Sequence, residues 1–265
     1  MYEFAYHRPA SLDDALKALG GASDGKFLAG GMTLIPTLKQ RLAQPSDLVD
    51  LGRISELKGI RKEGDSIVVG AMSTHAEVAA STDVREAIPA LAKLAESIGD
   101  PQVRNRGTIG GSIANADPAA DYPAAIVGLG ATVHTNNRTI AGDDYFTGLF
   151  ETALEEGELV TAVSFPVPKR AAYAKFPNPA SRYAVVGVMV AETGDGVRVA
   201  VTGAGASAFR VPEMEKALGS SFTPDALAGI SVPPDELNSD LHASAEYRAH
   251  LVTVMAKRAV AAASS

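Results

Sequence analysis

Apolar and polar residues alternate along this chain in short blocks, some with the period of a helix and others with the continuous run of a buried strand. The first blocks predict a helix over 11–19, a strand over 26–29, a helix over 33–42 and a strand over 47–51. Ser11 and Thr33 are suited to begin the two helices, because a hydroxyl oxygen accepts a hydrogen bond from an otherwise unpaired amide. Residues 1–55 are therefore expected to form a small α/β unit.

The rest of the chain continues this mixture of helices and strands. Between Glu56 and Pro168 the pattern predicts strands over 66–71, 131–135 and 159–165 and helices over 85–98 and 122–129. After the break at Pro166–Pro168 it predicts strands over 183–191 and 197–203 and helices over 212–218, 224–228 and 245–262. The expected units are thus 1–55, 56–168 and 169–265.

The composition narrows the possible functions. The formal net charge is −7, which argues against nucleic acid as a partner, since phosphate binding requires clustered Lys and Arg. No cysteine is present, so this chain has no disulfide, thiolate-held iron–sulfur cluster or cysteine nucleophile. The five histidines form no zinc-binding pair, and no apolar run is long enough to span a membrane. A cytoplasmic protein is expected.

Two diglycine turns carry the clearest chemical signal in the chain. Gly30-Gly31 follows a predicted strand and precedes a helix, and Gly110-Gly111 lies in the middle unit. Glycine adopts positive φ and leaves backbone N–H groups open to an anion, and a helix start adds a favourable dipole. Two such turns together can hold the diphosphate of a dinucleotide. Each turn is also compatible with a purely structural strand–helix connection.

Charged residues near the second turn have two interpretations each. Asp117 and Asp121, near the start of the helix predicted over 122–129, either cap that helix or interact favourably with its dipole. For Asp121 a further interpretation is a hydrogen bond to a ribose or ribityl hydroxyl group. Arg104 and Arg106 either neutralise a phosphate or form exposed salt bridges.

A third glycine motif, Gly203–Ala208, has the G-x-G-x-x-A spacing of a dinucleotide-binding turn. Too little chain follows it for the remaining β-α-β units of that fold, so we interpret it as unrelated to nucleotide binding. Valine at Gly203 is accordingly expected to leave a cofactor site intact. Tyr183 is expected on a sheet face and Lys175 on a solvated loop.

The two glycine turns and the residues around them resemble a known family. The matching segments are Ala29–Pro36 (AGGMTLIP), Asp100–Ser112 (DPQVRNRGTIGGS) and Ala116–Pro123 (ADPAADYP). Together they are similar to the FAD-binding medium subunits of molybdenum hydroxylases, the xanthine dehydrogenase family, and most of all to that of aerobic-type carbon monoxide dehydrogenase. The resemblance extends over essentially the whole chain.

This resemblance implies two α/β subdomains that hold FAD between them, followed by a C-terminal α+β domain with a three-stranded antiparallel sheet. It implies FAD contacts but no catalytic residue and no metal ligand in this chain. The implied contacts are Leu28, Ala29, Gly30, Gly31, Met32, Thr33, Leu34, Ile35, Ile98, Thr108, Ile109, Gly110, Gly111, Ser112, Asp121, Val160, Lys175 and Tyr183. Tyr183 corresponds to an aromatic residue near the flavin ring.

Several positions depart from the family pattern. Met32 stands where histidine is frequent, Ser112 where asparagine is common, and Arg182 where aspartate often precedes the tyrosine. The segment 176–180 replaces a stretch that is usually rich in Lys and Arg. These differences bear on the flavin environment and on a subunit contact.

The function implied by the resemblance is electron transfer within a larger enzyme. Substrate is hydroxylated at a molybdenum–pterin centre in a large subunit, and electrons pass through 2Fe–2S clusters of a small subunit to the FAD of this chain. The expected assembly is a dimer of heterotrimers in the cytoplasm, in peripheral contact with the inner membrane. Two alternatives stay open: a self-sufficient FAD oxidoreductase, and a flavin-free nucleotide-binding or regulatory module.

Overall fold

The N-terminal part of the chain is built on a small parallel sheet. The computed structural model describes residues 1–264. Strands β1 (Ala5–His7), β2 (Gly25–Leu28) and β3 (Asp47–Asp50) pair in the order β1-β3-β2. The helices are α1 (Leu12–Gly20), α2 (Leu34–Lys39), η1 (Leu51–Arg53) and η2 (Ser55–Leu57). Ser11 begins α1 as predicted, its Oγ accepting a hydrogen bond from the amide of Asp14 at 3.2 Å.

The middle part surrounds an antiparallel sheet in the order β4-β5-β10-β6-β7. Its strands are β4 (Ile60–Glu63), β5 (Ser66–Gly70), β6 (Thr132–Thr135), β7 (Thr139–Ala141) and β10 (Val160–Pro166), with a separate pair, β8 (Phe146–Gly148) and β9 (Glu151–Thr152). Its helices are α3 (His75–Ala80), α4 (Thr82–Ala87), α5 (Pro89–Glu96), α6 (Pro101–Arg104), α7 (Ile109–Asn115), α8 (Tyr122–Gly128) and α9 (Gly142–Tyr145).

The helix predicted over 85–98 is wrong as a single element. It is two helices, α4 and α5, separated at Ile88, which has φ −137° and ψ 68°. The residue before a proline avoids the helical region because the proline ring clashes with it, and Pro89 follows here. The apolar period of Ile88, Leu91 and Leu94 survives the break, since all three side chains are fully buried in the same core.

The C-terminal part is an antiparallel sheet in the order β11-β12-β13-β14, covered by helices. Its elements are β11 (Arg170–Pro177), β12 (Ala184–Thr193), β13 (Gly196–Thr202), β14 (Phe209–Arg210), α10 (Pro212–Ser220), η3 (Pro224–Leu227) and α11 (Ala245–Ala263). The expected three-stranded sheet is present as β11, β12 and β13, and the two-residue β14 extends it by one short strand.

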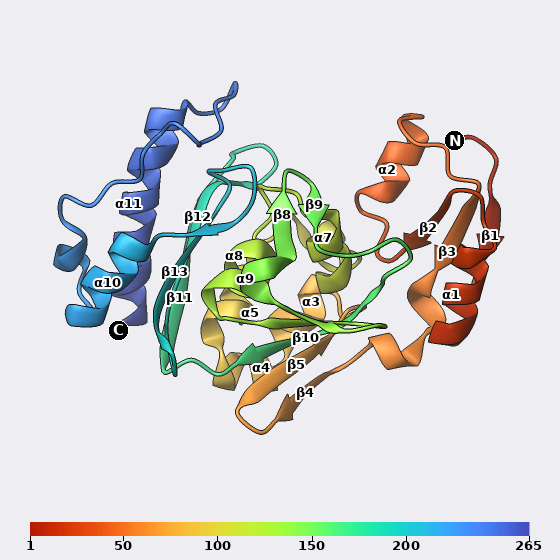
Figure 1. The fold of residues 1–265 in the computed structure, drawn as a ribbon, viewed down its shortest axis with the longest axis horizontal. Helices are drawn as coiled ribbons and strands as arrows, with labels where there is room; N and C mark the ends of the chain where they lie inside the picture. Colours follow the sequence, from red (N-terminus) through yellow and green to blue (C-terminus); the bar gives the residue numbers. More distant parts are fainter. Residues whose placement is uncertain (265) are drawn as a thin grey trace.

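This sheet is buried on both faces, which explains why its central strand is almost entirely apolar. Figure 1 shows β11, β12 and β13 standing between α11 on one side and the middle part of the chain on the other. Side chains of β12 point alternately into two hydrophobic cores, one on each face of the sheet. Val186 and Val188 pack with α11, whereas Met189 and Ala191 pack into the core of the middle part. The C-terminal sheet is therefore the middle layer between α11 and the middle part of the chain.

The placement of Lys175 on a solvated loop is wrong. It lies in β11, which pairs with β12 along its whole length, and its side chain is 8% exposed. The strand has the sequence RAAYAKFP, whose alanines have little intrinsic preference for a strand. Pairing with β12 decides its conformation.

None of the helices in residues 1–264 combines the length and the apolar composition that a bilayer crossing requires.

Candidate functional site

The two diglycine turns lie in direct contact. A Cβ atom at Gly30 would stand 2.0 Å from the carbonyl oxygen of Arg106 and 2.9 Å from the Cα of Gly107. A Cβ atom at Gly111 would stand 3.5 Å from the Cβ of Ala29. The backbone of the first turn thus rests on the backbone that leads into the second, and glycine at position 30 is required by this close approach.

The first turn presents a run of unpaired backbone amides. Within residues 1–264, the N–H groups of residues 30–34 donate to no acceptor, and Gly31 has φ +75°. Helix α2 begins directly afterwards, and the Thr33 side chain makes no capping hydrogen bond. Successive free amides at a helix start form a concave site that favours an anion.

The second turn is different, because its amides already have partners. The amide of Ile109 donates to the carbonyl of Ser73 at 3.1 Å, and that of Gly110 to the carbonyl of Ala71 at 2.9 Å. The amide of Gly111 donates to Thr108 Oγ1 at 3.1 Å. A Cβ atom at Gly110 would stand 2.6 Å from the Cβ of Ala71. The second turn therefore packs against the end of β5 with its amides paired. The free amides are those of the first turn.

A cavity of about 600 Å³ runs along these turns; residues of the N-terminal and middle parts of the chain line it, as do those just before β12. This is within the range of roughly 300–1,000 Å³ typical of small-molecule sites. Most of the residues proposed from the sequence line it: Ala29, Gly30, Gly31, Met32, Thr33, Leu34, Ile98, Thr108, Gly110, Gly111, Ser112, Asp121, Val160 and Tyr183.

The other proposed residues, Leu28, Ile35, Ile109 and Lys175, do not line this cavity. Leu28 and Ile35 pack where a Cβ of Gly31 would stand, at 3.3 Å and 2.8 Å. Ile109 is fully buried in the core of the middle part. These three side chains support the turns from behind, so any contact they make with a ligand is through the backbone.

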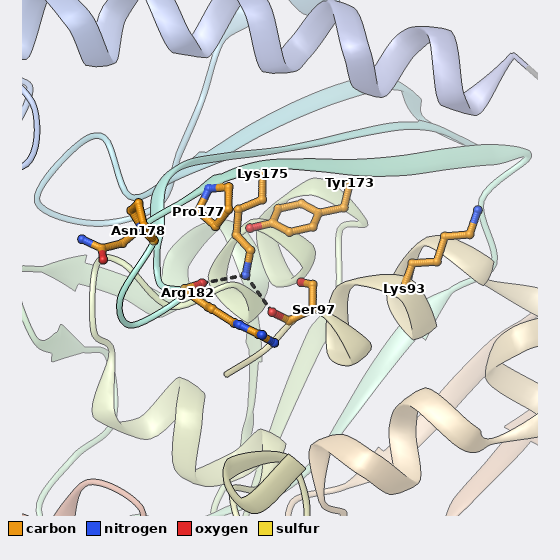
Figure 2. Close-up of a pocket in the computed structure, with 8 residues that line it drawn as sticks. Lys93, Ser97, Tyr173, Lys175, Pro177, Asn178 and Arg182 are labelled. Atoms are coloured by element: carbon orange, nitrogen blue, oxygen red, sulfur yellow. Dashed lines mark hydrogen bonds between the residues drawn. The ribbon is translucent and has the colours of Figure 1, made fainter. Parts of the chain in front are cut away.

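Asp121 and Lys175 form a buried ion pair at one end of the cavity. The Nζ of Lys175 lies 3.0 Å from Asp121 Oδ1 and also donates to the carbonyls of Ser97, at 3.0 Å, and Arg182, at 2.9 Å. Figure 2 shows the ammonium group pointing between these two carbonyls. The hydroxyl of Tyr173 donates to Asp121 Oδ1 at 2.6 Å. Asp121 makes no capping bond to α8, so its interpretation as a side-chain cap is wrong.

Burial raises the pKa of the Asp121 carboxyl, and the neighbouring Lys175 ammonium acts in the opposite direction. The nearby Asp117 also lines the cavity, and burial raises its pKa although its Oδ1 accepts a hydrogen bond from the amide of Ala119 at 2.9 Å. The cavity therefore has two carboxylates, which suit hydroxyl groups, separate from the amides, which suit phosphates.

Tyr183 is 44% exposed and belongs to a short loop before β12 rather than to the strand itself. The loop is tied by Asn178, whose Oδ1 accepts hydrogen bonds from the amides of Ala180 and Ser181 at 2.9 Å and 3.2 Å. Arg182, in the same loop, has φ +63°. It lines the cavity described above and also a second, more open cavity of about 450 Å³, which Lys93 and Lys175 line as well (Figure 2).

His75 is a lining residue that the sequence did not single out. It is 4% exposed, its Nδ1 has no hydrogen-bond partner within residues 1–264, and its ring lies 5.4 Å from that of Tyr122. Burial, and then the positive charge of Arg104, lower the pKa of His75 to about 4. Thr74 and Glu77 form a capping box that begins α3 at this residue, and the ring packs against Gly107.

Neither arginine beside the second turn lines the cavity. Arg104 donates to the carbonyls of Ile98 and Gly99, both at 3.0 Å, beyond the end of α5. Arg106 contributes its backbone carbonyl to the contact with Gly30. The sequence suggested phosphate neutralisation or exposed salt bridges for these two residues. It suggested neither the hydrogen bonds of the Arg104 side chain to backbone carbonyls nor the contact of the Arg106 carbonyl with Gly30.

Comparison with known proteins assigns the fold. Residues 2–168 match the family described as the FAD binding domain in molybdopterin dehydrogenase, and residues 171–263 match the CO dehydrogenase flavoprotein C-terminal domain. The chain belongs to this flavoprotein family. The resemblance noted in the sequence and the expected fold class are both confirmed.

Relatives in this family cover nearly the whole chain. It is 37% identical to the carbon monoxide dehydrogenase medium chain of Hydrogenophaga pseudoflava, over 98% of this chain and 96% of the relative. It is 38% identical to the nicotine 6-hydroxylase medium subunit of Paenarthrobacter nicotinovorans, over 96% and 95%. The structure of reconstituted CO dehydrogenase from Oligotropha carboxidovorans superposes with a TM-score of 0.90 at 36% identity, covering 99% of this chain and 98% of that one.

The residues of the cavity fit the cofactor of this flavoprotein family. FAD requires donors for its diphosphate, acceptors for its hydroxyl groups and an apolar or aromatic surface for its ring. The free amides of residues 30–34 can supply the donors, and the carboxylates of Asp117 and Asp121 can supply acceptors. Ile98, Val160 and Tyr183 supply apolar and aromatic surface. Within residues 1–264 no cluster of three or more His, Asp or Glu side chains could hold a metal ion.

Proposed function

We propose that this chain is the FAD-carrying electron-transfer subunit of a molybdenum hydroxylase complex and binds FAD non-covalently in the cavity described above. The observation that carries the proposal is the run of amides over residues 30–34, which has no acceptor within residues 1–264 and lines a cavity at the start of a helix. A diphosphate supplies the missing acceptors.

Each part of the cavity has a distinct role in this proposal. The free amides of residues 30–34 bind the diphosphate, in a turn whose backbone extends from Leu28 to Ile35, and the lining residues among 108–112 form another wall of the cavity. Asp121, held by Lys175, binds hydroxyl groups of the cofactor, while Ile98, Val160 and Tyr183 exclude water from its ring. Bound FAD supplies the redox chemistry, accepting electrons and passing them on. The protein binds and orients it and tunes its electrostatic surroundings.

We propose the division of the chain into an N-terminal FAD-binding subdomain over 1–55, a middle FAD-binding subdomain over 56–168 and a C-terminal flavoprotein domain over 169–265. Each has its own sheet in the structure. The cavity takes residues from all three of these segments, so binding of FAD would couple them.

The proposed partners are a large molybdenum–pterin subunit and a small subunit with 2Fe–2S clusters. The relatives in Hydrogenophaga pseudoflava and Paenarthrobacter nicotinovorans are named as medium chain and medium subunit, which supports a complex of several chains. The absence of cysteine means that thiolate-bound clusters belong to another chain. A dimer of heterotrimers in the cytoplasm, in peripheral contact with the inner membrane, is the assembly that we propose.

The proposal is tested by purifying the complex through a tag on this chain. Denaturation should release FAD into the supernatant, and mass spectrometry should identify the two partner chains. The isolated chain, supplied with FAD, should not turn over aldehydes, carbon monoxide or heterocycles. A complex without flavin, or flavin that stays on the precipitated chain, would contradict the proposal. Multi-turnover oxidation by the chain alone would favour a self-sufficient oxidoreductase.

A matched pair of variants tests the amide run directly. Met32 lines the cavity and is 38% exposed, so the fold should accept a polar side chain there. Met32→Glu places a carboxylate beside the amides and should weaken FAD binding on the order of tenfold or more, because like charges repel. Met32→Gln has the same shape without the charge and should bind FAD nearly as wild type. Equal affinities of the two variants would refute the diphosphate position.

A further inference from the structure

The acidic segment Asp117–Asp121 is held by the C-terminal sheet through its backbone carbonyls. The hydroxyl of Thr202, at the end of β13, lies 2.6 Å from the carbonyl oxygen of Ala120 and 3.0 Å from that of Pro118. Thr202 is fully buried. The amide of Gly203 donates to the carbonyl of Pro118 at 2.7 Å. A hydroxyl has one proton, and the shorter of its two contacts, to Ala120, is the stronger hydrogen bond.

A third contact completes the attachment. The amide of Ala184, at the start of β12, donates to the carbonyl of Ala119 at 3.1 Å. Three consecutive carbonyls of the segment therefore accept hydrogen bonds from β12, β13 and the residue after β13. Buried carbonyls are rarely left unpaired, so each contact fixes the backbone at its position.

The backbone of residues 118–120 depends on these contacts for its direction. The three residues between Asp117 and Asp121 are a proline and two alanines, with no polar side chain to anchor them. The hydrogen bonds that the amides of Ala119 and Ala120 donate both return to Asp117. At the other end of the segment the Asp121 carboxylate is held by Tyr173 and Lys175 of β11, so the carbonyl contacts are what join the backbone between the two carboxylates to the sheet. Both terminal carboxylates line the cavity.

We propose that Thr202 is a positioning residue for the cofactor site, whose hydroxyl fixes the Ala120 carbonyl and so directs the carboxylates of Asp117 and Asp121 into the cavity. This inference rests on the FAD site of the proposed function. The Thr202 hydroxyl acts through the backbone of the segment and does not itself line the cavity.

The same geometry explains the third glycine motif. Gly203 has φ +83°, and a Cβ atom there would stand 2.5 Å from the carbonyl oxygen of Ala184. Glycine at this position lets the chain turn so that its amide reaches Pro118. Valine at Gly203 would clash with the Ala184 carbonyl, so we now expect it to disturb the acidic segment and not to leave the cofactor site intact, although no residue of the motif lines the cavity. Gly203 holds the acidic segment through its amide and lies outside the cavity itself.

The test compares Thr202→Val with a matched control in the complex stripped of flavin and titrated with FAD. Valine keeps the shape of threonine and removes only the hydroxyl. Thr253→Val is the control, because Thr253 Oγ1 makes a similar hydrogen bond, 2.9 Å to the carbonyl of Ile230, in α11 away from the cavity. Thr202→Val should raise the dissociation constant of FAD on the order of tenfold, comparable to the loss of one hydrogen bond, and change the flavin midpoint potential. Thr202→Ser should restore both.

The outcomes separate positioning from simple stabilisation. Both valine variants are expected to lower the unfolding temperature of the flavin-free protein, and only Thr202→Val should change the dissociation constant and the potential. Equal effects of the two variants on FAD, or wild-type values in Thr202→Val, would overturn the inference. Should Thr202→Val not fold, Thr202→Ala is measured against Thr253→Ala by the same criteria. Wild-type protein that binds no FAD would instead refute the proposed function.

Discussion

Acidification should destabilise this protein through His75, and the size of the effect follows from its burial. The side chain is 4% exposed and its pKa is lowered from 6.5 to about 4. The unfolded chain therefore binds a proton on this residue at a higher pH than the folded chain does. Above the unfolded pKa of 6.5 the histidine is neutral in both states and the free energy of unfolding is at its full value. As the pH falls from 6.5 toward 4, protonation of the unfolded chain lowers that free energy.

The magnitude is set by the shift in pKa. At about 1.4 kcal/mol for each unit, the full loss below the folded pKa is about 3 kcal/mol, and between pH 7 and pH 5 it is about 2 kcal/mol. Because His75 is almost completely buried, solvent screening does not reduce this value appreciably.

The assay is urea denaturation followed by circular dichroism across this pH range, for wild type and for His75→Gln. The variant lacks the titrating group, and every other histidine and carboxylate is common to the two proteins, so their contributions cancel in the difference. The free energy of unfolding of the wild type should fall by about 2 kcal/mol more than that of the variant between pH 7 and pH 5. Parallel pH profiles would refute the argument that His75 is neutral and buried in the folded state.

Three further predictions concern the packing and the ligand of the cavity. Gly30→Ala puts a methyl group against the Arg106 carbonyl, so calorimetry of the flavin-free protein should show a lower unfolding temperature than wild type. An unchanged temperature would mean that the two turns are not in contact. Lys175→Met leaves the buried Asp121 carboxylate without its cation and should cost about 3–5 kcal/mol in urea denaturation. A cost below about 1 kcal/mol, as for an exposed pair, would contradict the assignment of a buried ion pair. FAD at a hundredfold excess over its dissociation constant should stabilise wild type by about 2.7 kcal/mol, and chemical denaturation without such a shift would show that FAD does not bind the native state preferentially.

Local signals in the sequence predicted local structure well. Ser11 begins its helix because its hydroxyl accepts a hydrogen bond from a backbone amide three residues ahead, a relation that the sequence alone displays. Thr33, predicted on the same grounds, precedes α2 but its side chain makes no such bond. The break between α4 and α5 was also visible, in Pro89, but the apolar period on both sides of it favoured one continuous helix.

Features that depend on distant partners could not be predicted. Strand β11 forms because β12 pairs with it, and the alanines in its sequence give no sign of this. The sequence located both glycine turns, but it could not show that Ser73 and Ala71 occupy the amides of the second one. The packing of His75 against Gly107 is likewise a contact between distant segments.

The contact between Gly30 and the Arg106–Gly107 peptide also bears on how quickly the site forms and is lost. It joins segments far apart along the chain, and closing the intervening loop costs entropy before the contact contributes to stability. Contacts of this kind are expected to form late, after the folding transition state. Interactions absent from that state slow unfolding without speeding folding. In kinetic terms, FAD bound at this contact would prolong the lifetime of the native protein and leave the rate of its formation nearly unchanged.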